Sequence, residues 1–380
     1  MDDLQVASQL LGVDAKFLQP FDATDPFNDG VRLEGFLSQR PDHRYGALAL
    51  LRVGGEPALQ AIYATPKVSY PFGKSGRFHF PPIQHVHLYE KLDGTNVLAY
   101  RYRDAGGRCR QTYKLRLAPT LRNSKWGPFL DFWQELLAKH PNIGQLVEVN
   151  RCHVSFEMYG ARNAHLMAYA TDLAVAVLFG VRPSDASVVA PFALDVRGVP
   201  TAPLLGELDG RDDPVMKFAA MREEMESRNR PAADERLEGI EGAVWYVTEP
   251  NGRVTMWKCK PESVESIHVA TGISKAGVTA TCWNALETSD VLDYDVLLPL
   301  LLEEYAPGDV ERFRPQIDEA IRAVNQQFEF RQYVWSLYAQ LQAQGMSIQT
   351  DKAAVMRALA PHFRQQQMKR VYTAIISKGG

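Results

Sequence analysis

The sequence predicts an α+β protein in which a β-rich part is followed by a helical part. Segments rich in β-branched and aromatic residues, separated by glycine-containing turns, dominate residues 85–260. Beyond Cys282, apolar residues recur at the i, i+3 and i+4 spacing of amphipathic helices. The 380 residues suffice for two domains or more at ~100–200 residues each, and a content of 46% apolar residues excludes global disorder.

The β-rich part begins with residues 1–80, whose proline, glycine and aromatic residues predict short strands and loops joined to the domain that follows. One helix is expected over residues 128–139, where Phe129, Phe132 and Trp133 have helical spacing. Strands are expected over residues 85–90, 96–102, 147–157, 173–181, 243–247 and 254–260.

The helical part is expected to hold three helices, with breaks at Pro307-Gly308 and Gly345 and with Asp309 and Thr350 as N-caps. Their apolar stripes would pack on one another and form a self-contained unit. The expected helices cover residues 290–305, 310–341 and 350–377. The predicted organisation is an N-terminal segment over residues 1–80, a β-rich domain over 81–282 and a helical domain over 283–380.

Charge and cysteine content narrow the class of protein. A net charge of −3, from 42 basic and 45 acidic side chains, argues against a wholly basic nucleic-acid coat but permits a local basic strip. The 4 cysteines form no Cys-x-x-Cys pair, which favours buried thiols over disulfides or a structural zinc site. Apolar runs are far shorter than the ~20 residues of a membrane span, and the first residues are acidic, unlike a signal peptide. We therefore expect a cytoplasmic protein.

The segment Glu90-Lys91-Leu92-Asp93-Gly94-Thr95-Asn96 is the most informative pattern. It predicts a strand that ends at Glu90, a turn in which Gly94 adopts a positive φ, and a second strand from Asn96. Lys91 then lies at a strand end, beside polar groups that a nucleotide could contact. Taken alone, the segment fits an ordinary surface hairpin equally well, because Asp-Gly turns are common.

This segment resembles motif I of the covalent nucleotidyltransferases, the superfamily of ATP-dependent ligases and RNA capping enzymes. Other segments resemble the later motifs of the superfamily in the same order, and the match covers residues 85–262. The resemblance implies a ligase-type nucleotidyltransferase domain, related to the ATP-grasp fold, of antiparallel sheets with flanking helices. The later segments are Ser-Phe-Glu-Met-Tyr-Gly at 155–160 (motif III), Val-Ala-Val-Leu-Phe-Gly at 175–180 (IIIa), Glu-Gly-Ala-Val at 241–244 (IV) and Trp-Lys-Cys-Lys at 257–260 (V).

Asn96 discriminates within the superfamily, because the resemblance places Asn there in phage-type RNA ligases and Arg in DNA ligases and capping enzymes. Those two classes also continue into an OB-fold after motif V, whereas helices are expected here. The resemblance thus implies an ATP-dependent RNA ligase that seals RNA 5′-phosphate and 3′-hydroxyl ends and has an all-helical C-terminal domain. Because the motifs all precede Pro261, our hypothesis is that this domain positions the RNA ends. The alternatives are a DNA ligase, a capping-type guanylyltransferase, or a nucleotide- and RNA-binding protein that has lost catalysis.

The residues themselves suggest how such a site would be built. A hairpin turn at residues 249–252 would bring Glu241 roughly level with Lys260, within a few residues of register. Strand periodicity would put Lys258 and Lys260 on one face, with Cys259 on the other. Two lysines and a carboxylate would suit a triphosphate with its metal. The alternative, a solvated edge strand blunted by lysines, is less favoured because Met256 and Trp257 flank them.

Roles for these residues follow from the resemblance. Lys91 would attack the α-phosphate of ATP and carry the AMP covalently, while Lys258 and Lys260 neutralise phosphate charge. Glu241 would hold Mg²⁺ (or Mn²⁺), and Glu157 would hold the ribose or a metal-bound water. Phe179 would stack on adenine. The remaining expected nucleotide contacts are Glu90, Asp93, Asn96, Arg122 and Lys125.

A basic strip with interleaved aromatics lies between motifs I and III, over residues 101–125. This composition suits single-stranded nucleic acid, although half of the arginines would equally well cover a hairpin. The basic residues are Arg101, Arg103, Arg108, Arg110, Lys114, Arg116, Arg122 and Lys125, and the aromatics are Tyr100, Tyr102, Tyr113 and Trp126.

The pair His85 and His87, in the strand that leads to Lys91, could ligate a metal. No third ligand is evident near them in the sequence, so ordinary strand-face histidines are the favoured interpretation.

Overall fold

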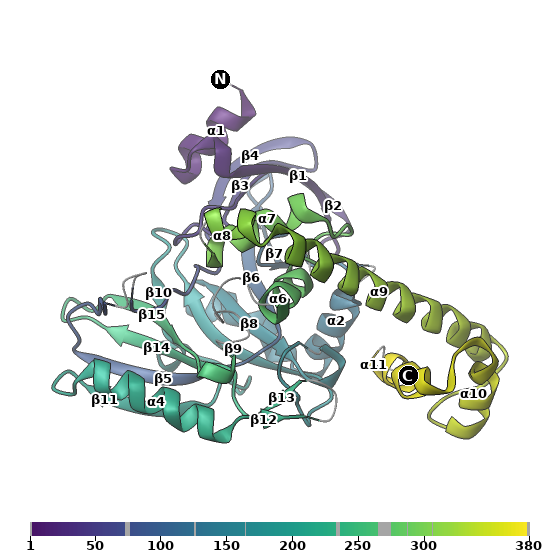
Figure 1. Cartoon of the computed structure of the whole chain (residues 1–380). Coiled ribbons are helices and arrows are strands. Elements are labelled where there is room, and N and C mark those ends of the chain that lie inside the picture. Colours follow the sequence, from purple (N-terminus) through teal and green to yellow (C-terminus); the bar gives the residue numbers. More distant parts are fainter. Residues whose placement is uncertain are drawn as a thin grey trace.

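The computed structural model describes residues 2–72, 77–124, 127–163, 165–232, 236–264, 275–286, 288–305 and 307–377. It confirms the α+β class: antiparallel sheets occupy the first two thirds of the chain, and helices follow (Figure 1). Among these residues no helix is long and apolar enough to cross a membrane.

The N-terminal segment forms a four-stranded antiparallel sheet with the strands in sequence order. Its elements are α1 (Asp3–Leu11), β1 (Leu18–Asp25), β2 (Val31–Ser38), β3 (Leu48–Val53) and β4 (Glu56–Ile62). The expected strands are present, but helix α1 was not anticipated. Its boundaries are readable in retrospect, because the Asp2 carboxylate caps the first turn and Gly12 ends the helix at φ 62°.

The central sheet has five strands in the order β10-β9-β8-β6-β7. Its strands are β6 (Thr95–Arg103), β7 (Cys109–Leu115), β8 (His153–Tyr159), β9 (Ala174–Val181) and β10 (Val188–Val189). Helix α2 (Phe129–Lys139) covers one face, where Trp133 packs on Phe156.

The predicted strand over residues 147–157 is wrong in its first part. Residues Leu146–Asn150 form a short helix, α3, and strand β8 begins only at His153. Arg151 separates the two in the left-handed region at φ 52°. Val147 joins the apolar core under α2, and that burial accounts for the apolar character of the segment.

The other face of the central sheet is shared between two partners. Leu98 and Tyr100 of β6 pack against the N-terminal sheet. Phe179 of β9 packs against a second four-stranded sheet. The strands of this sheet are, in order, β11 (Leu204–Asp209), β5 (His85–Lys91), β14 (Gly242–Thr248) and β15 (Val254–Cys259). Helix α4 (Pro214–Arg228) packs on the outer face of this sheet, and β12 (Arg230–Pro231) pairs with β13 (Leu237–Glu238) beside it.

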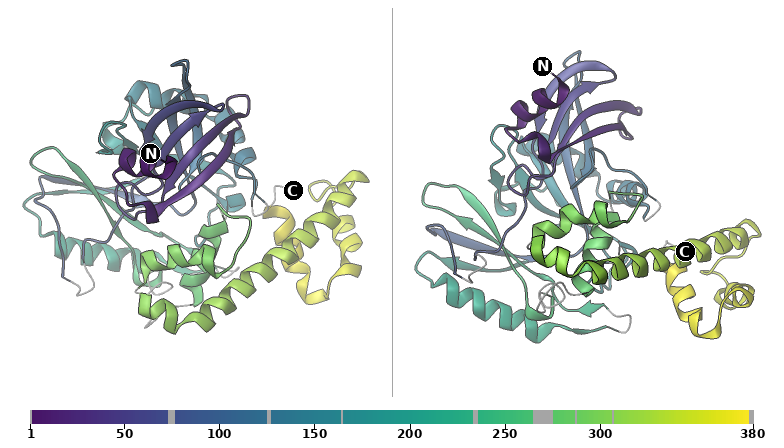
Figure 2. Two further views of the ribbon diagram at one scale, coloured as in Figure 1. Left: turned by 90° about the horizontal axis from the view of Figure 1, so that it is seen from above. Right: turned by 45° about the horizontal axis from the view of Figure 1, so that its top comes forward.

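The helical part differs from the expected single unit of three helices. Helices α6 (Lys275–Leu286), α7 (Tyr294–Glu304) and α8 (Pro307–Arg312) share one apolar core with the first half of α9 (Arg314–Ala343). The second half of α9 forms another core with α10 (Lys352–Leu359) and α11 (Met368–Ser377). Helix α9, ~45 Å long at 1.5 Å per residue, joins the two cores and extends from the body of the molecule (Figures 1 and 2).

The predicted helix caps are also corrected. Asp309 lies inside the first turn of α8, and the caps of α7 and α10 are Asp293 and Asp351, whose carboxylates accept backbone N–H groups. Helix α6 runs across the domain boundary expected at residue 282, so Cys282 lies in the first helical core.

Candidate active site

Lys91, Glu241 and Lys260 form a three-charge cluster at one end of the second four-stranded sheet. Lys91 is the last residue of β5 and pairs with Gly242 of β14, so Glu241 lies beside it. The Glu241 carboxylate accepts from Lys91 Nζ at 2.5 Å and from Lys260 Nζ at 2.9 Å. Residues 150 positions apart in the sequence thus meet through the pairing of two strands.

The β14–β15 hairpin places the lysines as its sequence predicts. Gly252, at φ 81°, closes the turn with a hydrogen bond to the Glu249 carbonyl. Cys259 points into the core under α4, and its thiol contacts the Phe218 carbonyl. Lys258 lies on the other face, with Nζ 4.4 Å from the centre of the Tyr70 ring.

Electrostatics keep Glu241 ionised. Burial alone would raise the pKa of Glu241, but the charges of Lys260 and Lys91 and their hydrogen bonds lower it to about 2. The cluster of two ammonium groups and one carboxylate carries a net charge of +1, which suits the phosphate groups of a nucleotide better than a bare cation.

Replacing Glu241 by glutamine should destabilise the protein by about 3 kcal/mol at pH 7, because two partly buried ammonium groups lose their counter-charge. The folded-state pKa is depressed, so the contribution is full above pH ~4.5 and declines as the pH falls towards 2. Urea unfolding at several pH values should show the difference between wild type and Glu241→Gln narrowing below pH ~4.5. A difference independent of pH would contradict this account.

Asp93 holds the turn after Lys91 in place. Its carboxylate accepts from the Met167 backbone N–H at 2.6 Å, and its own N–H donates to the Tyr169 hydroxyl at 2.8 Å. Burial, followed by the charge of Glu241, raises the pKa of Asp93. Tyr169 was missed by sequence reasoning, since no local spacing links it to a turn 76 residues away.

Gly94 has a different role from the predicted one. It does not adopt a positive φ, and a Cβ there would lie 2.2 Å from the Met158 carbonyl oxygen. The absence of a side chain therefore lets the turn approach strand β8.

Gly94→Ala should accordingly cost about 1–3 kcal/mol through overpacking and reduce any reaction at Lys91, three residues away. Gly144→Ala is the matched control, because beyond its own neighbours in the chain no atom of the described residues lies within 4 Å of the position that its new methyl group would occupy. Chemical denaturation of both variants tests this. Equal stability of the two would mean that the turn adjusts freely.

Asn96 and Glu157 are opposite each other on β6 and β8, so their side chains share a face of the central sheet. Asn96 donates to Ser155 Oγ at 2.9 Å and to the Phe156 carbonyl at 3.0 Å, and it accepts from Thr65 Oγ1 at 2.8 Å. Both of its amide protons are therefore used within the protein. The Glu157 side chain is buried beside it.

Phe179 and Glu90 occupy less open positions than the sequence suggested. Phe179 is 3% exposed in the cluster between the central and second sheets, near Tyr89 and Tyr246, and little of its ring is available for stacking on a base. Glu90 is half-buried, and burial raises the pKa of its carboxyl.

Arg122 contacts the helical part of the chain. Its guanidinium contacts the Asp290 carboxylate at 3.0 Å and the Thr288 carbonyl at 3.2 Å, both in the helical part. It lines a cavity of about 830 Å³ between β1, residues 117–122 and Thr288. Lys125 and Trp126 are outside the described residues.

The basic strip is not a continuous nucleic-acid surface. Tyr100, Tyr102 and Tyr113 are buried because strand alternation turns them into apolar cores, so they offer no rings for base stacking. Arg101 pairs with Glu148 of α3, and Arg110 pairs with Asp104 in the β6–β7 hairpin. The arginines of this segment therefore cover the β6–β7 hairpin, the alternative to a nucleic-acid surface.

The cluster of Lys91, Glu241 and Lys260 would bind a divalent metal ion only together with a nucleotide. Both carboxylate oxygens of Glu241 are engaged by ammonium groups. Mg²⁺ in nucleotide sites is held by one or two carboxylates plus the substrate phosphates. Glu241, with Glu157 on the neighbouring sheet, has the oxygen donors for that arrangement.

Comparisons with known proteins give structural similarity only. No protein-family model and no curated protein matches the chain. Among solved structures, two forms of an archaeal ATP-dependent RNA ligase are similar. Form 2 has a TM-score of 0.46 and 15% identity, and the match covers 100% of each chain. Form 1 has a TM-score of 0.45 and 15% identity, and the match covers 90% of this chain and 83% of that one. A candidate ATP-dependent DNA ligase of Aquifex aeolicus has TM-score 0.41 at 12% identity, covering 80% of this chain and 74% of its own.

Proposed function

We propose that the protein is an ATP-dependent RNA ligase that works through a covalent lysyl-adenylate. The observation that carries the proposal is the convergence of Lys91, Glu241 and Lys260, from segments resembling motifs I, IV and V. The three groups occupy one end of a single sheet, with Asp93 fixing the turn behind the lysine. Asn96, with the helices that follow motif V, favours RNA over DNA as the substrate.

The reaction would proceed in three nucleotidyl transfers. Lys91 Nζ, after losing a proton, attacks the α-phosphorus of ATP; a P–N bond forms, and the bond to the departing pyrophosphate breaks. An RNA 5′-phosphate then attacks the same phosphorus, the P–N bond breaks and an RNA 5′-adenylate forms. An RNA 3′-hydroxyl, losing its proton to solvent, attacks the RNA 5′-phosphorus; a phosphodiester bond forms and AMP leaves. Lys260 and Lys258 lower the barrier by neutralising charge on the phosphate oxygens. A bound Mg²⁺ would supply further charge neutralisation.

Incubation with α-labelled ATP or GTP and Mg²⁺, followed by denaturing electrophoresis, tests the first transfer. We expect a covalent label from ATP and little from GTP. A label from GTP instead would favour a capping-type enzyme, and the lack of any label would favour a nucleotide-binding protein without catalysis.

Sealing assays then test the substrate. With matched RNA and DNA strands that carry 5′-phosphate and 3′-hydroxyl ends, we expect joined RNA and little joined DNA. Efficient joining of nicked DNA alone would contradict the assignment to RNA.

A further inference from the structure

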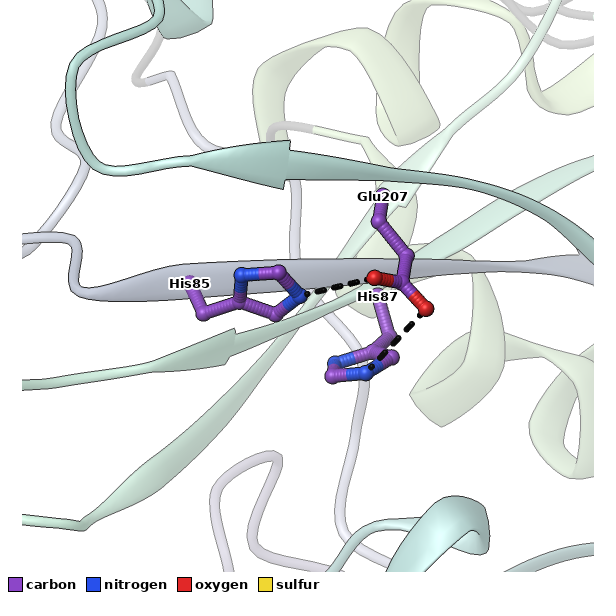
Figure 3. A group of neighbouring side chains, drawn as sticks. All are labelled: His85, His87 and Glu207. Carbon is purple, nitrogen blue, oxygen red and sulfur yellow. Dashed lines mark hydrogen bonds and ion pairs between the residues drawn. The ribbon is translucent and has the colours of Figure 1, made fainter.

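His85, His87 and Glu207 form a cluster that the reaction above does not use (Figure 3). His85 and His87 are two residues apart on β5, so both rings project from the same face of the strand. Glu207 lies on the neighbouring strand β11, directly opposite His87. The third ligand that the sequence around the histidines lacks is thus supplied by a strand 120 residues further along the chain.

The two histidine–carboxylate distances, one of them a hydrogen bond, are close to the ligand–ligand distances of a metal site. His85 Nε2 lies 3.2 Å from Glu207 Oε2, and His87 Nε2 lies 3.6 Å from Glu207 Oε1. Zinc–ligand bonds of about 2.0–2.2 Å in tetrahedral geometry place neighbouring ligand atoms about 3.3–3.6 Å apart. The three ligand atoms lie within 4.8 Å of one another, so small side-chain movements would close them on one ion.

Packing holds one ligand in position. The His87 ring stacks on Phe192, with centroids 3.9 Å apart and planes 24° apart. Its Nδ1 is buried without a hydrogen-bond partner among the described residues, so stacking rather than hydrogen bonding fixes the ring plane. Its Nε2 faces Glu207 (Figure 3). A ring held in this way loses little freedom on binding an ion.

We propose that His85, His87 and Glu207 bind a divalent ion of the zinc class. Two imidazoles and one carboxylate are a ligand set of Zn²⁺ and related first-row ions, and they differ from the all-oxygen environment that Mg²⁺ prefers. The nearby Asp209 carboxylate is held by Arg211, which leaves the fourth position to water or a small anion.

The ion would tie the edge strand β11 to β5, the strand that ends in Lys91. His85, His87 and Lys91 lie on one face of β5, with ~13 Å of strand between His87 and Lys91. The site is therefore separate from the three-charge cluster, and the proposal does not depend on the ligase function.

The test is metal binding by the full-length chain after chelator treatment and without ATP. Titration with Co²⁺, followed by visible absorption, and competition with Zn²⁺ should reveal one site per chain with a tetrahedral spectrum. His85→Ala and the nearly isosteric Glu207→Gln should each weaken binding at least tenfold. Zn²⁺ should also raise the melting temperature of the wild type and not that of Glu207→Gln.

Two control variants exclude other ligands. Cys109 is an exposed thiol, and His43 is an exposed histidine elsewhere, so Cys109→Ser and His43→Ala should both retain the site. The proposal is overturned if no stoichiometric binding occurs, if binding survives both His85→Ala and Glu207→Gln, or if only Cys109→Ser abolishes it. If His85→Ala fails to fold, Glu207→Gln alone decides between these outcomes.

Discussion

Replacing Lys91 by alanine should abolish covalent labelling by ATP, a loss of roughly 10⁴-fold or more, because the attacking amine is removed. The fold should survive the change. Glu241 keeps Lys260 as a partner at 2.9 Å, so no buried carboxylate is left without a counter-charge. Lys91→Ala therefore separates chemistry from stability, whereas Glu241→Gln affects both.

The measurement is labelling with α-labelled ATP, followed by peptide mapping of the modified residue. Lys139→Ala, at the exposed end of α2, is the matched control and should label like the wild type. The outcome most damaging to the assignment would be retained labelling of Lys91→Ala with the AMP on Lys260, which shares the same carboxylate. Loss of labelling together with loss of structure would be detected by circular dichroism.

The features that sequence reasoning predicted correctly are those with local causes. Alternation and turn chemistry located β5, β6 and the β14–β15 hairpin, and helical spacing located α2. The meeting of Glu241 with Lys260 followed from that hairpin, whose antiparallel register brings the two within one residue of level.

The features that it missed depend on distant partners. The burial of Tyr100 and Tyr102 is decided by a sheet from residues 18–62, and a strand pattern cannot show which face will be covered. Gly94 is explained by the Met158 carbonyl on another strand, not by its own φ. His85 and His87 lacked a third ligand until β11 brought Glu207 opposite them.

One helix of the second helical core contacts the segment next to the Asp93 turn, and this bears on the RNA-joining steps of the proposed function. Helix α11 packs against η3 (Ala161–Asn163), the segment just before the residues that hold Asp93. Burial and the charges of Arg370 and Arg236 lower the pKa of Arg331, so three arginines from separate segments lie within electrostatic reach. Arg331 is partly buried against the Trp283 ring, whereas Arg370 is exposed, so we propose that Arg370 in particular contacts the phosphates of an RNA strand.

A chain ending at Glu329 should label itself with AMP within about twofold of the wild type, yet seal RNA with a preformed 5′-adenylate at least about tenfold more slowly. This cut removes the second core and leaves the first, whereas a cut near Trp283 would run through α6. The expected split arises because the segments that resemble the nucleotide motifs all precede Pro261, while the arginines on α9 and α11 follow it.

Point variants test the same idea without removing the contact between α11 and η3. Arg370→Ala, at an exposed arginine of α11, should reproduce part of the loss of sealing and weaken its dependence on salt, because fewer phosphate contacts release fewer counterions. Arg357→Ala, an exposed arginine on α10 of the same core, should behave like the wild type. Normal sealing by the truncated chain would show that the second core is dispensable for RNA. Failure of a folded truncated chain to label itself would instead mean that these helices help to complete the nucleotide site.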